Sequence, residues 1–281
     1  MLTGTRLAVW GDPIAHSLSP VLHGAAYRVL GLDWTYERRQ VPESLFDEFL
    51  AGLDESWRGL SCTMPLKAAA FAASAERDRR AELTGAVNTL LLEPAGIRGF
   101  NTDVGGIVRS LREEGVDRVD DARIVGAGAT AASALVALAE LGATHVEVVA
   151  RRPLAVAPLE ELGDRLGVVV LPVPFDAAGH AAMPVTIAAL PGGARVAPAS
   201  VEALRDAGGL LVDVVYGHWP TALSAAWEDA GLRAVSGLGM LLHQALLQVR
   251  VFVGGDVEAP LAGEDVILAA MREALAGPVG G

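Results

Sequence analysis

The sequence predicts an α/β protein with two domains. Three observations support this prediction. Strand-like and helix-like segments alternate along the chain, its 281 residues have room for two modest domains, and a glycine-rich turn in mid-chain joins a strand directly to a helix. The chain is 52% hydrophobic and 20% charged, which is enough to bury a core and excludes a disordered chain.

In the first part of the chain, apolar runs predict strands that alternate with helices. The expected strands are 7–10, 34–41, 60–64, 86–92 and 99–103, and the expected helices are 20–30, 42–53 and 68–80. Ser19 is expected to cap its helix, because Pro20 then takes the first helical position, and Gly31 is expected to end it. A turn at 94–96 separates the last two strands.

A helix at 103–115 is expected to lead into a second unit with parallel strands. Its expected strands are 123–125, 146–149, 168–171, 186–189 and 210–215, with helices between them. From Gly237 the tail is helical, and its leucines recur at the spacing of a buried helix face. The predicted domains are 1–104, completed by helices in 237–281, and 105–236.

Charge and cysteine content limit the classes of partner. With 22 basic and 34 acidic residues, the net charge of −12 repels phosphate backbones and anionic lipid, so we expect no nucleic-acid or membrane partner. A single cysteine, Cys62, excludes an internal disulfide framework and is expected to be buried. The six histidines show no metal-ligand spacing, so no metal site is predicted.

No targeting or membrane segment is expected. Gly11-Asp12-Pro13 interrupts the N-terminal apolar run before a signal-peptide core can form. The uncharged run 124–139 is shorter than the ~18 residues that a spanning helix needs. These features predict a soluble, cytoplasmic protein.

Lys67 is the single lysine among the 22 basic residues. A GC-rich genome would explain the arginines, and chance would explain one surviving lysine. Lysine differs from arginine in that it can lose its proton when its surroundings lower the pKa. A position that must transfer a proton would therefore keep lysine, and both interpretations stay open at this point.

The glycine-rich turn predicts a dinucleotide site. A strand at 123–125 runs into Gly126-x-Gly128, and a helix begins at once. The first glycine permits a tight turn, and the second lets the backbone approach a pyrophosphate at the helix N-terminus. An ordinary strand–turn–helix connection would have the same pattern. The expected cofactor-binding residues of this Rossmann-like domain are Gly126, Ala127, Gly128, Ala129, Thr130 and Ala131.

Arg151 and Arg152 follow the next strand, 25 residues after Gly126 counted to Arg151. An NAD site would carry Asp or Glu there to bind the ribose hydroxyls, whereas arginine suits the 2′-phosphate of NADP. Two solvated surface arginines are the alternative. The pair favours NADP as cofactor.

Other polar residues form candidate substrate sites. Ser17 and Ser19 point the same way in an extended segment and could hold a carboxylate or a polyol, although Ser19 could serve only as a helix cap. Lys67 and Asp103 follow the ends of two strands and could transfer a proton as a pair, or form a structural salt bridge. Gln244 and Gln248 lie on the tail helix, where either could be an exposed polar position.

Six motifs in order resemble the shikimate dehydrogenase family. They are Gly11–Pro20 with His23, Thr63–Lys67, Gly85–Thr89, Gly99–Asp103, Asp213–Tyr216 and Gly237–Gln244. This resemblance runs almost from end to end of the chain. It implies NADPH-dependent reduction of 3-dehydroshikimate to shikimate in aromatic amino-acid biosynthesis, with substrate in the N-terminal domain.

The resemblance also implies roles for individual residues. Lys67 would move the proton, with Asp103 orienting it. Ser17 and Ser19 would bind the substrate carboxylate. The ring hydroxyls would be held by Thr63, Asn88, Asp103 and Gln244. Tyr216 would lie near the substrate, and Gly237 and Met240 would lie near the nicotinamide.

Three departures from the family pattern keep alternatives open. Ser61 stands where the family usually has asparagine, Ala150-Arg151-Arg152 replaces Asn-Arg-Thr, and Ala188–Gly193 replaces an Asn-Ala-Thr-type loop. Ser61 and the loop Ala188–Gly193 allow a paralogue that acts on quinate or an amino-analogue of shikimate. The loop also allows a sensor that keeps the fold without turnover, and Ala150-Arg151-Arg152 bears on the preference for NADP. The sequence leaves open whether the chain forms a homodimer.

Overall fold

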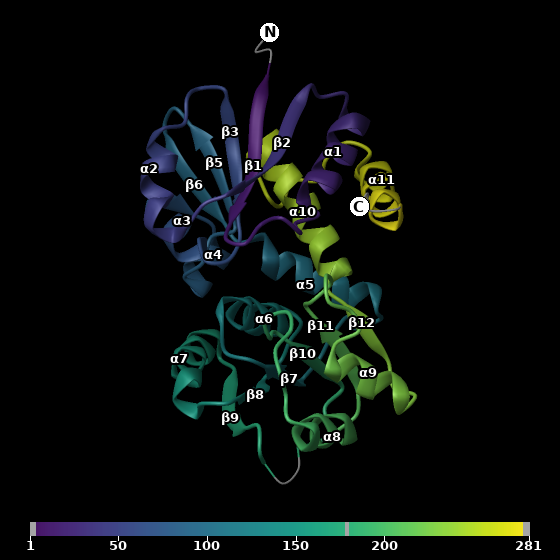
Figure 1. Cartoon of the computed structure of the whole chain (residues 1–281). Coiled ribbons are helices and arrows are strands. Elements are labelled where there is room, and N and C mark those ends of the chain that lie inside the picture. The colour runs from purple at the N-terminus through teal and green to yellow at the C-terminus, as the bar shows by residue number, and fades with distance from the viewer. Residues whose placement is uncertain (1–3, 178–179, 278–281) are drawn as a thin grey trace. The chain divides into compact units, whose positions relative to one another are not determined.

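The computed structural model describes residues 4–177 and 180–277 and confirms the α/β class, with two six-stranded sheets (Figure 1). Contacts group the chain into two units. The first unit is Met1–Gly106 with Leu242–Gly281, and the second is Ile107–Leu241. The chain passes from the first unit to the second within α5 (Thr102–Glu113) and returns within α10 (Leu238–Gly254).

The first unit is built on a mixed sheet in the order β2-β1-β3-β5-β6-β4. Its elements are β1 (Thr5–Gly11), α1 (Ser19–Leu30), β2 (Trp34–Gln40), η1 (Glu43–Leu45), α2 (Phe46–Ala51), β3 (Trp57–Cys62), α3 (Lys67–Ala73), β4 (Glu76–Arg77), α4 (Arg79–Thr84), β5 (Thr89–Glu93), β6 (Gly96–Phe100) and α11 (Glu264–Ala276). Both β1–β2 and β1–β3 are parallel, whereas β5 runs antiparallel to β3 and β6. The sheet is mixed because a hairpin, and not a crossover helix, joins β5 to β6.

The two faces of this sheet are covered by different helices. One face presents Ala8, Trp10, Leu60 and Cys62, which pack with side chains of α2 and α3. On the other face α10 approaches so closely that a Cβ on Gly59 would lie 2.5 Å from the Phe252 ring. Cys62 is buried, as expected, and burial raises the pKa of its thiol to about 12.

Two local expectations in this unit are wrong. The helix expected at 68–80 ends at Ser74, because Ala75 and Asp78 donate backbone hydrogen bonds to Ile97 and Gly99 and add β4 to the sheet edge. Asp78 then caps α4 by accepting from the Ala81 N–H at 2.7 Å. Ser19 is the first residue of α1 and makes no cap hydrogen bond, whereas Gly31 ends the helix in the left-handed conformation as expected.

The second unit is a fully parallel sheet in the order β12-β11-β10-β7-β8-β9. Its elements are β7 (Asp121–Val125), α6 (Ala129–Glu140), β8 (His145–Ala150), η2 (Pro153–Val156), α7 (Ala157–Leu166), β9 (Val169–Pro174), β10 (Val185–Ala188), α8 (Pro198–Asp206), β11 (Leu210–Asp213), α9 (Ala222–Asp229) and β12 (Ala234–Ser236). Read from β7, this is the 3-2-1-4-5-6 order of the Rossmann fold, in which ligands bind at the carboxyl ends of the strands where the order reverses.

Here the order reverses between β7 and β10. These strands are parallel neighbours, so the loops after Val125 and Ala188 lie side by side at the carboxyl ends of the strands. A core of buried side chains from the strands, α8 and α9 fixes these loop ends. It contains Val125, Val149, Ala188, Val201, Leu204, Leu211, Leu223 and Trp227. Among the described residues, no helix is both long and apolar enough to cross a membrane.

Candidate active site

Lys67 and Asp103 are joined by a short ion pair in the first unit. Lys67 begins α3 and Asp103 lies in the first turn of α5, and the distance from Nζ to Oδ2 is 2.6 Å. Their side chains are 16% and 8% exposed, so little water competes with the bond. The carboxylate is further stabilised by its place at the N-terminal end of α5.

Asn88 fixes the other oxygen of Asp103. Its Nδ2 donates to Asp103 Oδ1 at 2.8 Å and to Thr102 Oγ1 at 2.9 Å. Its Oδ1 accepts from the Thr102 backbone N–H at 2.9 Å. Each carboxylate oxygen of Asp103 therefore has one donor, which orients the group toward the lysine ammonium.

A buried chain of hydrogen bonds extends from Asn88 through Gln248. Gln248 Nε2 donates to the Asn88 carbonyl oxygen at 3.4 Å, and its Oε1 accepts from Ser61 Oγ at 2.7 Å and contacts His23 Nε2 at 3.1 Å. With the amide reversed, its oxygen would face the Asn88 carbonyl oxygen, so this orientation is the favourable one. Gln248 is 2% exposed and Gln244 is 7% exposed, so neither is an exposed polar position.

His23 is neutral within this chain. Burial lowers the pKa of its imidazole to about 3. Because Gln248 Oε1 can only accept, His23 Nε2 carries the proton, and Nδ1 accepts from the Tyr27 hydroxyl at 3.1 Å. The ring also stacks on Tyr36 at a centroid distance of 3.9 Å. The orientation of Gln248 thus determines which nitrogen of the neutral imidazole carries the proton.

Ser17 and Ser19 follow β1, with Ser19 at the start of α1, and Thr63 directly follows β3. The Ser19 backbone N–H donates to Ser17 Oγ at 3.3 Å, which brings the two serines together. A Cβ on Gly11 would lie 2.4 Å from Thr63 Cγ2, so glycine at this strand end allows Thr63 its place. Ser61 Oγ accepts a hydrogen bond from the Tyr36 hydroxyl and donates one to Gln248 Oε1.

In the second unit the glycine turn lies against the loop after β10. Gly126 has φ +117°, and a Cβ there would lie 2.7 Å from the Ala189 carbonyl oxygen. Gly128 precedes α6 as its N-cap, and a Cβ there would meet nothing within 4 Å. Ala129, Thr130 and Ala131 form the first turn of α6. Backbone N–H groups in the first turn of a helix lack intrahelical partners and can bind an anion. Ala127 completes the turn.

Arg151 lines a pocket of about 450 Å³ with the loop after β10. Phe175, Leu190 and Arg195 also line this pocket. Arg152 does not line it and instead precedes η2 as its N-cap. The two expected phosphate ligands therefore differ in position, with Arg151 at the pocket and Arg152 outside its lining.

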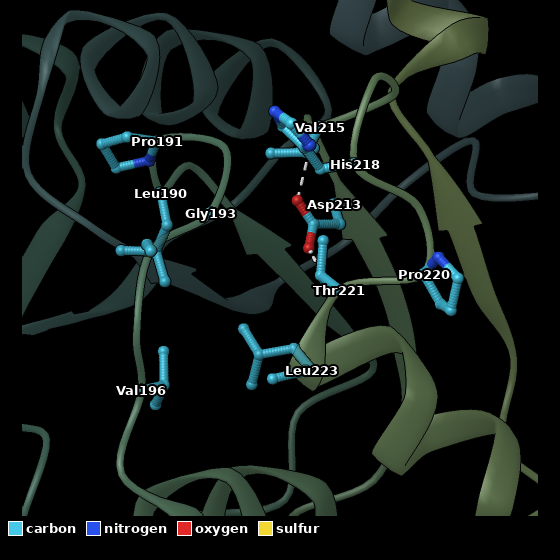
Figure 2. Close-up of a pocket in the computed structure, with 12 residues that line it drawn as sticks. Leu190, Pro191, Gly193, Val196, Asp213, Val215, His218, Pro220, Thr221 and Leu223 are labelled. Atoms are coloured by element: carbon cyan, nitrogen blue, oxygen red, sulfur yellow. Dashed lines mark hydrogen bonds between the residues drawn. The ribbon is translucent and has the colours of Figure 1, made fainter.

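Asp213 orders the connection that carries Tyr216. Figure 2 shows its carboxyl group between Val215 and Thr221: Oδ1 accepts from the Val215 N–H at 3.1 Å, and Oδ2 accepts from Oγ1 of Thr221, the N-cap of α9, at 2.7 Å. Burial raises the pKa of this carboxyl. A neighbouring pocket of about 250 Å³ separates this connection from residues 190–196 (Figure 2).

Gly237 and Met240 stand at the start of α10. A Cβ on Gly237 would lie 2.1 Å from the Val214 carbonyl oxygen, so this close approach requires glycine. Met240 is 9% exposed. Gln244 follows on the same helix, within the first unit, whereas Tyr216 lies in the second. Among the described residues, no group of acidic, histidine or cysteine side chains is arranged to hold a metal ion.

The sequence analysis left open whether Gln248 is exposed, gave it no role, and did not consider Tyr36 or Arg38. The signal for Gln248 was a polar residue within the apolar face of the tail helix. For Tyr36 and Arg38, the signal was their alternation on one face of β2, which the sequence alone does not link to Ser17 and Ser19.

Comparisons with known proteins agree with this geometry. Residues 9–90 match the substrate-binding domain of shikimate dehydrogenase. The NADP⁺-dependent shikimate dehydrogenase of Methylobacterium radiotolerans is 39% identical over 264 residues, covering 86% of this chain and 88% of the relative.

Two crystal structures are similar to this chain in both fold and sequence. That of Mycobacterium tuberculosis shikimate dehydrogenase is 41% identical, with a TM-score of 0.84 over 95% of this chain and 99% of that one. That of Thermus thermophilus shikimate 5-dehydrogenase, in complex with NADP(H) and shikimate, is 31% identical, with a TM-score of 0.80 over 96% and 99%. The chain therefore belongs to the shikimate dehydrogenase family.

Proposed function

We propose that this protein is an NADP-dependent shikimate dehydrogenase, which reduces 3-dehydroshikimate to shikimate and catalyses the reverse oxidation. The observation that carries the proposal is the Lys67–Asp103 pair, with a distance of 2.6 Å and a second restraint from Asn88. A ketone that gains a hydride needs a proton on its oxygen, and a positioned ammonium can supply it.

The second unit fits a dinucleotide. Gly126 makes the tight turn, Gly128 leaves open space above the first turn of α6, and Arg151 lines the adjoining pocket. Gly126–Ala131 would hold the pyrophosphate, and Arg151, with Arg152, would hold the 2′-phosphate of NADP. Gly237 and Met240 are proposed to lie near the nicotinamide. When bound, the cofactor supplies or accepts the hydride.

The residues of the first unit bind the substrate and move the proton. Lys67 Nζ delivers a proton to the substrate oxygen in reduction and takes it back in oxidation. Asp103 Oδ2 holds that ammonium in place, and Asn88 prevents the carboxylate from rotating. Ser17 and Ser19 are proposed to bind the carboxylate. Thr63, Asn88, Asp103 and Gln244 are proposed to hold the ring hydroxyls, with Tyr216 near the substrate.

The proposal extends to the organisation of the protein. We assign the substrate to residues 1–104 with 237–281, and NADP to 105–236. The cytoplasmic location and the homodimer remain predictions, and sedimentation at several concentrations tests the latter.

The decisive experiment follows absorbance in the NADPH band with purified protein. Shikimate and quinate are each combined with NADP⁺ and NAD⁺ in parallel. We expect fast reduction with shikimate and NADP⁺. Faster turnover of quinate would indicate the paralogue, and protein that binds NADPH but turns over neither substrate would contradict the proposed activity in favour of a sensor.

Two variants test the cofactor preference in the same assay. Arg151→Gln should raise KM for NADP⁺ about 10-fold or more and leave KM for NAD⁺ nearly unchanged, because a charge-assisted phosphate contact is lost. Arg152→Gln is the matched control and should have the smaller effect, because Arg152 lies outside the pocket. An equal rise in KM for NADP⁺ and for NAD⁺ in Arg151→Gln would contradict the binding of the 2′-phosphate by Arg151.

A further inference from the structure

The edge strand β2 holds the segment that carries Ser17 and Ser19. Within the part of the chain that the structure describes, β2 pairs with β1 alone, and the side chains of Tyr36, Arg38 and Gln40 alternate onto one face. Arg38 and Gln40 form hydrogen bonds with residues of the segment Gly11–Ser19, and Tyr36 forms one with Ser61 on β3. The strand therefore shapes the proposed carboxylate site through side chains rather than through backbone pairing.

The three contacts follow the strand in order. Gln40 Nε2 donates to Asp12 Oδ1 at 2.7 Å, and Arg38 Nε donates to the Ser17 carbonyl oxygen at 2.7 Å. Tyr36 donates to Ser61 Oγ at 2.5 Å. Ser17 is thus held from β2 at its carbonyl group, and the Ser19 backbone N–H is tied in turn to Ser17 Oγ.

The guanidinium of Arg38 retains donors for a ligand. Nε is used by Ser17, but in residues 4–177 and 180–277 neither terminal nitrogen forms a hydrogen bond or ion pair. Asp12, the carboxylate of this segment, bonds to Gln40 and forms no ion pair with Arg38. Arg38 is exposed, so its planar pair of terminal nitrogens is accessible beside Ser17.

Charge decides what two serine hydroxyls select. Hydroxyl groups are neutral donors and acceptors, so Ser17 and Ser19 by themselves could hold a carboxylate or a neutral polyol. The net charge of −12 opposes the approach of an anion. Screening at physiological salt limits that effect to about 8 Å, so a cation held beside Ser17 dominates locally.

We infer that Arg38 is a specificity-determining residue, which makes the Ser17–Ser19 segment select an anionic ring substrate over a neutral one. The inference rests on the proposed function, because it takes the Ser17–Ser19 segment as the site of the substrate carboxylate. Arg38 acts by its charge, which its hydrogen bond to the Ser17 carbonyl oxygen holds beside the segment. Gln40 fixes the same segment at Asp12 without adding charge.

The test compares Arg38→Gln with Arg39→Gln. Arg39 is the next residue, but it lies on the opposite face of β2, where its guanidinium stacks on Phe49 at 4.1 Å. Both variants remove one positive charge from the same strand. Each is assayed with NADP⁺ and either shikimate or its neutral methyl ester, at low and high salt, and Tm reports folding.

For Arg38→Gln we expect KM for shikimate to rise about 10- to 100-fold, the range for losing a hydrogen bond to a charged group. We expect kcat to change less than about 2-fold, and KM for the methyl ester to stay near that of the wild type, because binding energy without a proton-transfer role affects KM alone. The salt dependence of kcat/KM for shikimate should decrease. Arg39→Gln should resemble the wild type in all of these measurements.

Two results would overturn the inference. An unchanged KM for shikimate in Arg38→Gln would show that the charge is not used, while wild-type turnover would leave the proposed function intact. Equal increases for shikimate and the ester would show that Arg38 only positions Ser17. Wild-type protein that neither binds shikimate in calorimetry nor oxidises it would instead contradict the proposed function, and with it this inference.

Discussion

The candidate substrate half and the candidate dinucleotide half are built by different means. In the first unit, polar side chains hold one another: Lys67 with Asp103, Asp103 with Asn88, and Asn88 with Gln248. In the second unit, the shape of the backbone dominates. Gly126 and Gly237 lie where a Cβ would be 2.7 and 2.1 Å from carbonyl oxygens of neighbouring segments.

This difference predicts which property a substitution changes in each half. A substitution in the side-chain network changes which groups carry protons and charge, while the sheets beneath can stay intact. A substitution at the glycines changes the space that the backbone leaves, so it affects packing or cofactor binding before chemistry. Three predictions test this distinction, from the largest expected effect to the smallest.

The largest effect is expected for Lys67→Arg. Arginine keeps the positive charge and can still pair with Asp103, but it does not release a proton at accessible pH. We expect kcat to fall about 10²–10⁴-fold, the usual contribution of positioned acid–base catalysis. The affinity for NADPH, measured by fluorescence titration, should stay near that of the wild type. A near-normal kcat would remove Lys67 as the proton carrier.

Much of the fold could be predicted from local patterns, and the failures have a common cause. Gly31 ends α1 because its left-handed conformation is a local property. The break of the expected 68–80 helix depends on backbone partners at Ile97 and Gly99, some twenty residues away in the sequence, where helical spacing carries no signal. The same applies to β12, whose three residues become a strand only by pairing with β11.

The candidate site divides in the same way. Lys67 and Asp103 were predictable because they follow strand ends, and the structure joins them directly. The pairing of Gln248 with His23 and Ser61 was not predictable, because helical periodicity says that a residue is buried and not which distant groups surround it. The link from Arg38 to Ser17 likewise depends on the path of a loop after β1.

An intermediate effect is expected from Gly126→Ala, with Gly128→Ala as its matched comparison. At Gly126 a Cβ meets the Ala189 carbonyl oxygen at 2.7 Å, and the residue has φ +117°. We expect about 1–3 kcal/mol less stability in urea unfolding. At Gly128 the backbone is extended and nothing lies within 4 Å, so stability should be unchanged in the absence of cofactor.

The same two variants separate packing from cofactor approach. If Gly128 lets the backbone approach a pyrophosphate, Gly128→Ala should raise KM for NADP⁺ without lowering the free energy of unfolding. Two results would contradict these roles. One is a lower free energy of unfolding for Gly128→Ala, and the other is an unchanged free energy of unfolding for Gly126→Ala.

The smallest effect at neutral pH concerns His23, whose neutral imidazole belongs to the side-chain network. Its pKa is lowered from 6.5 to about 3 in the folded protein, so between these values the unfolded chain binds the extra proton. The stability from this group is therefore present above pH 6.5 and declines as pH falls toward 3, by at most about 1.4 kcal/mol per pH unit. In the second unit, burial raises the pKa of Asp213, so its contribution to stability has the opposite sign and declines as pH rises through that raised pKa.

Urea unfolding between pH 4.5 and 6.5 measures the sum of these two contributions to the free energy of unfolding. His23→Gln should flatten the decline toward acid, whereas His16→Gln, which removes an exposed imidazole, should not. Identical slopes in the wild type and His23→Gln would show that His23 is not held neutral, and the direction assigned to its hydrogen bonds with Gln248 and Tyr27 would fail with it.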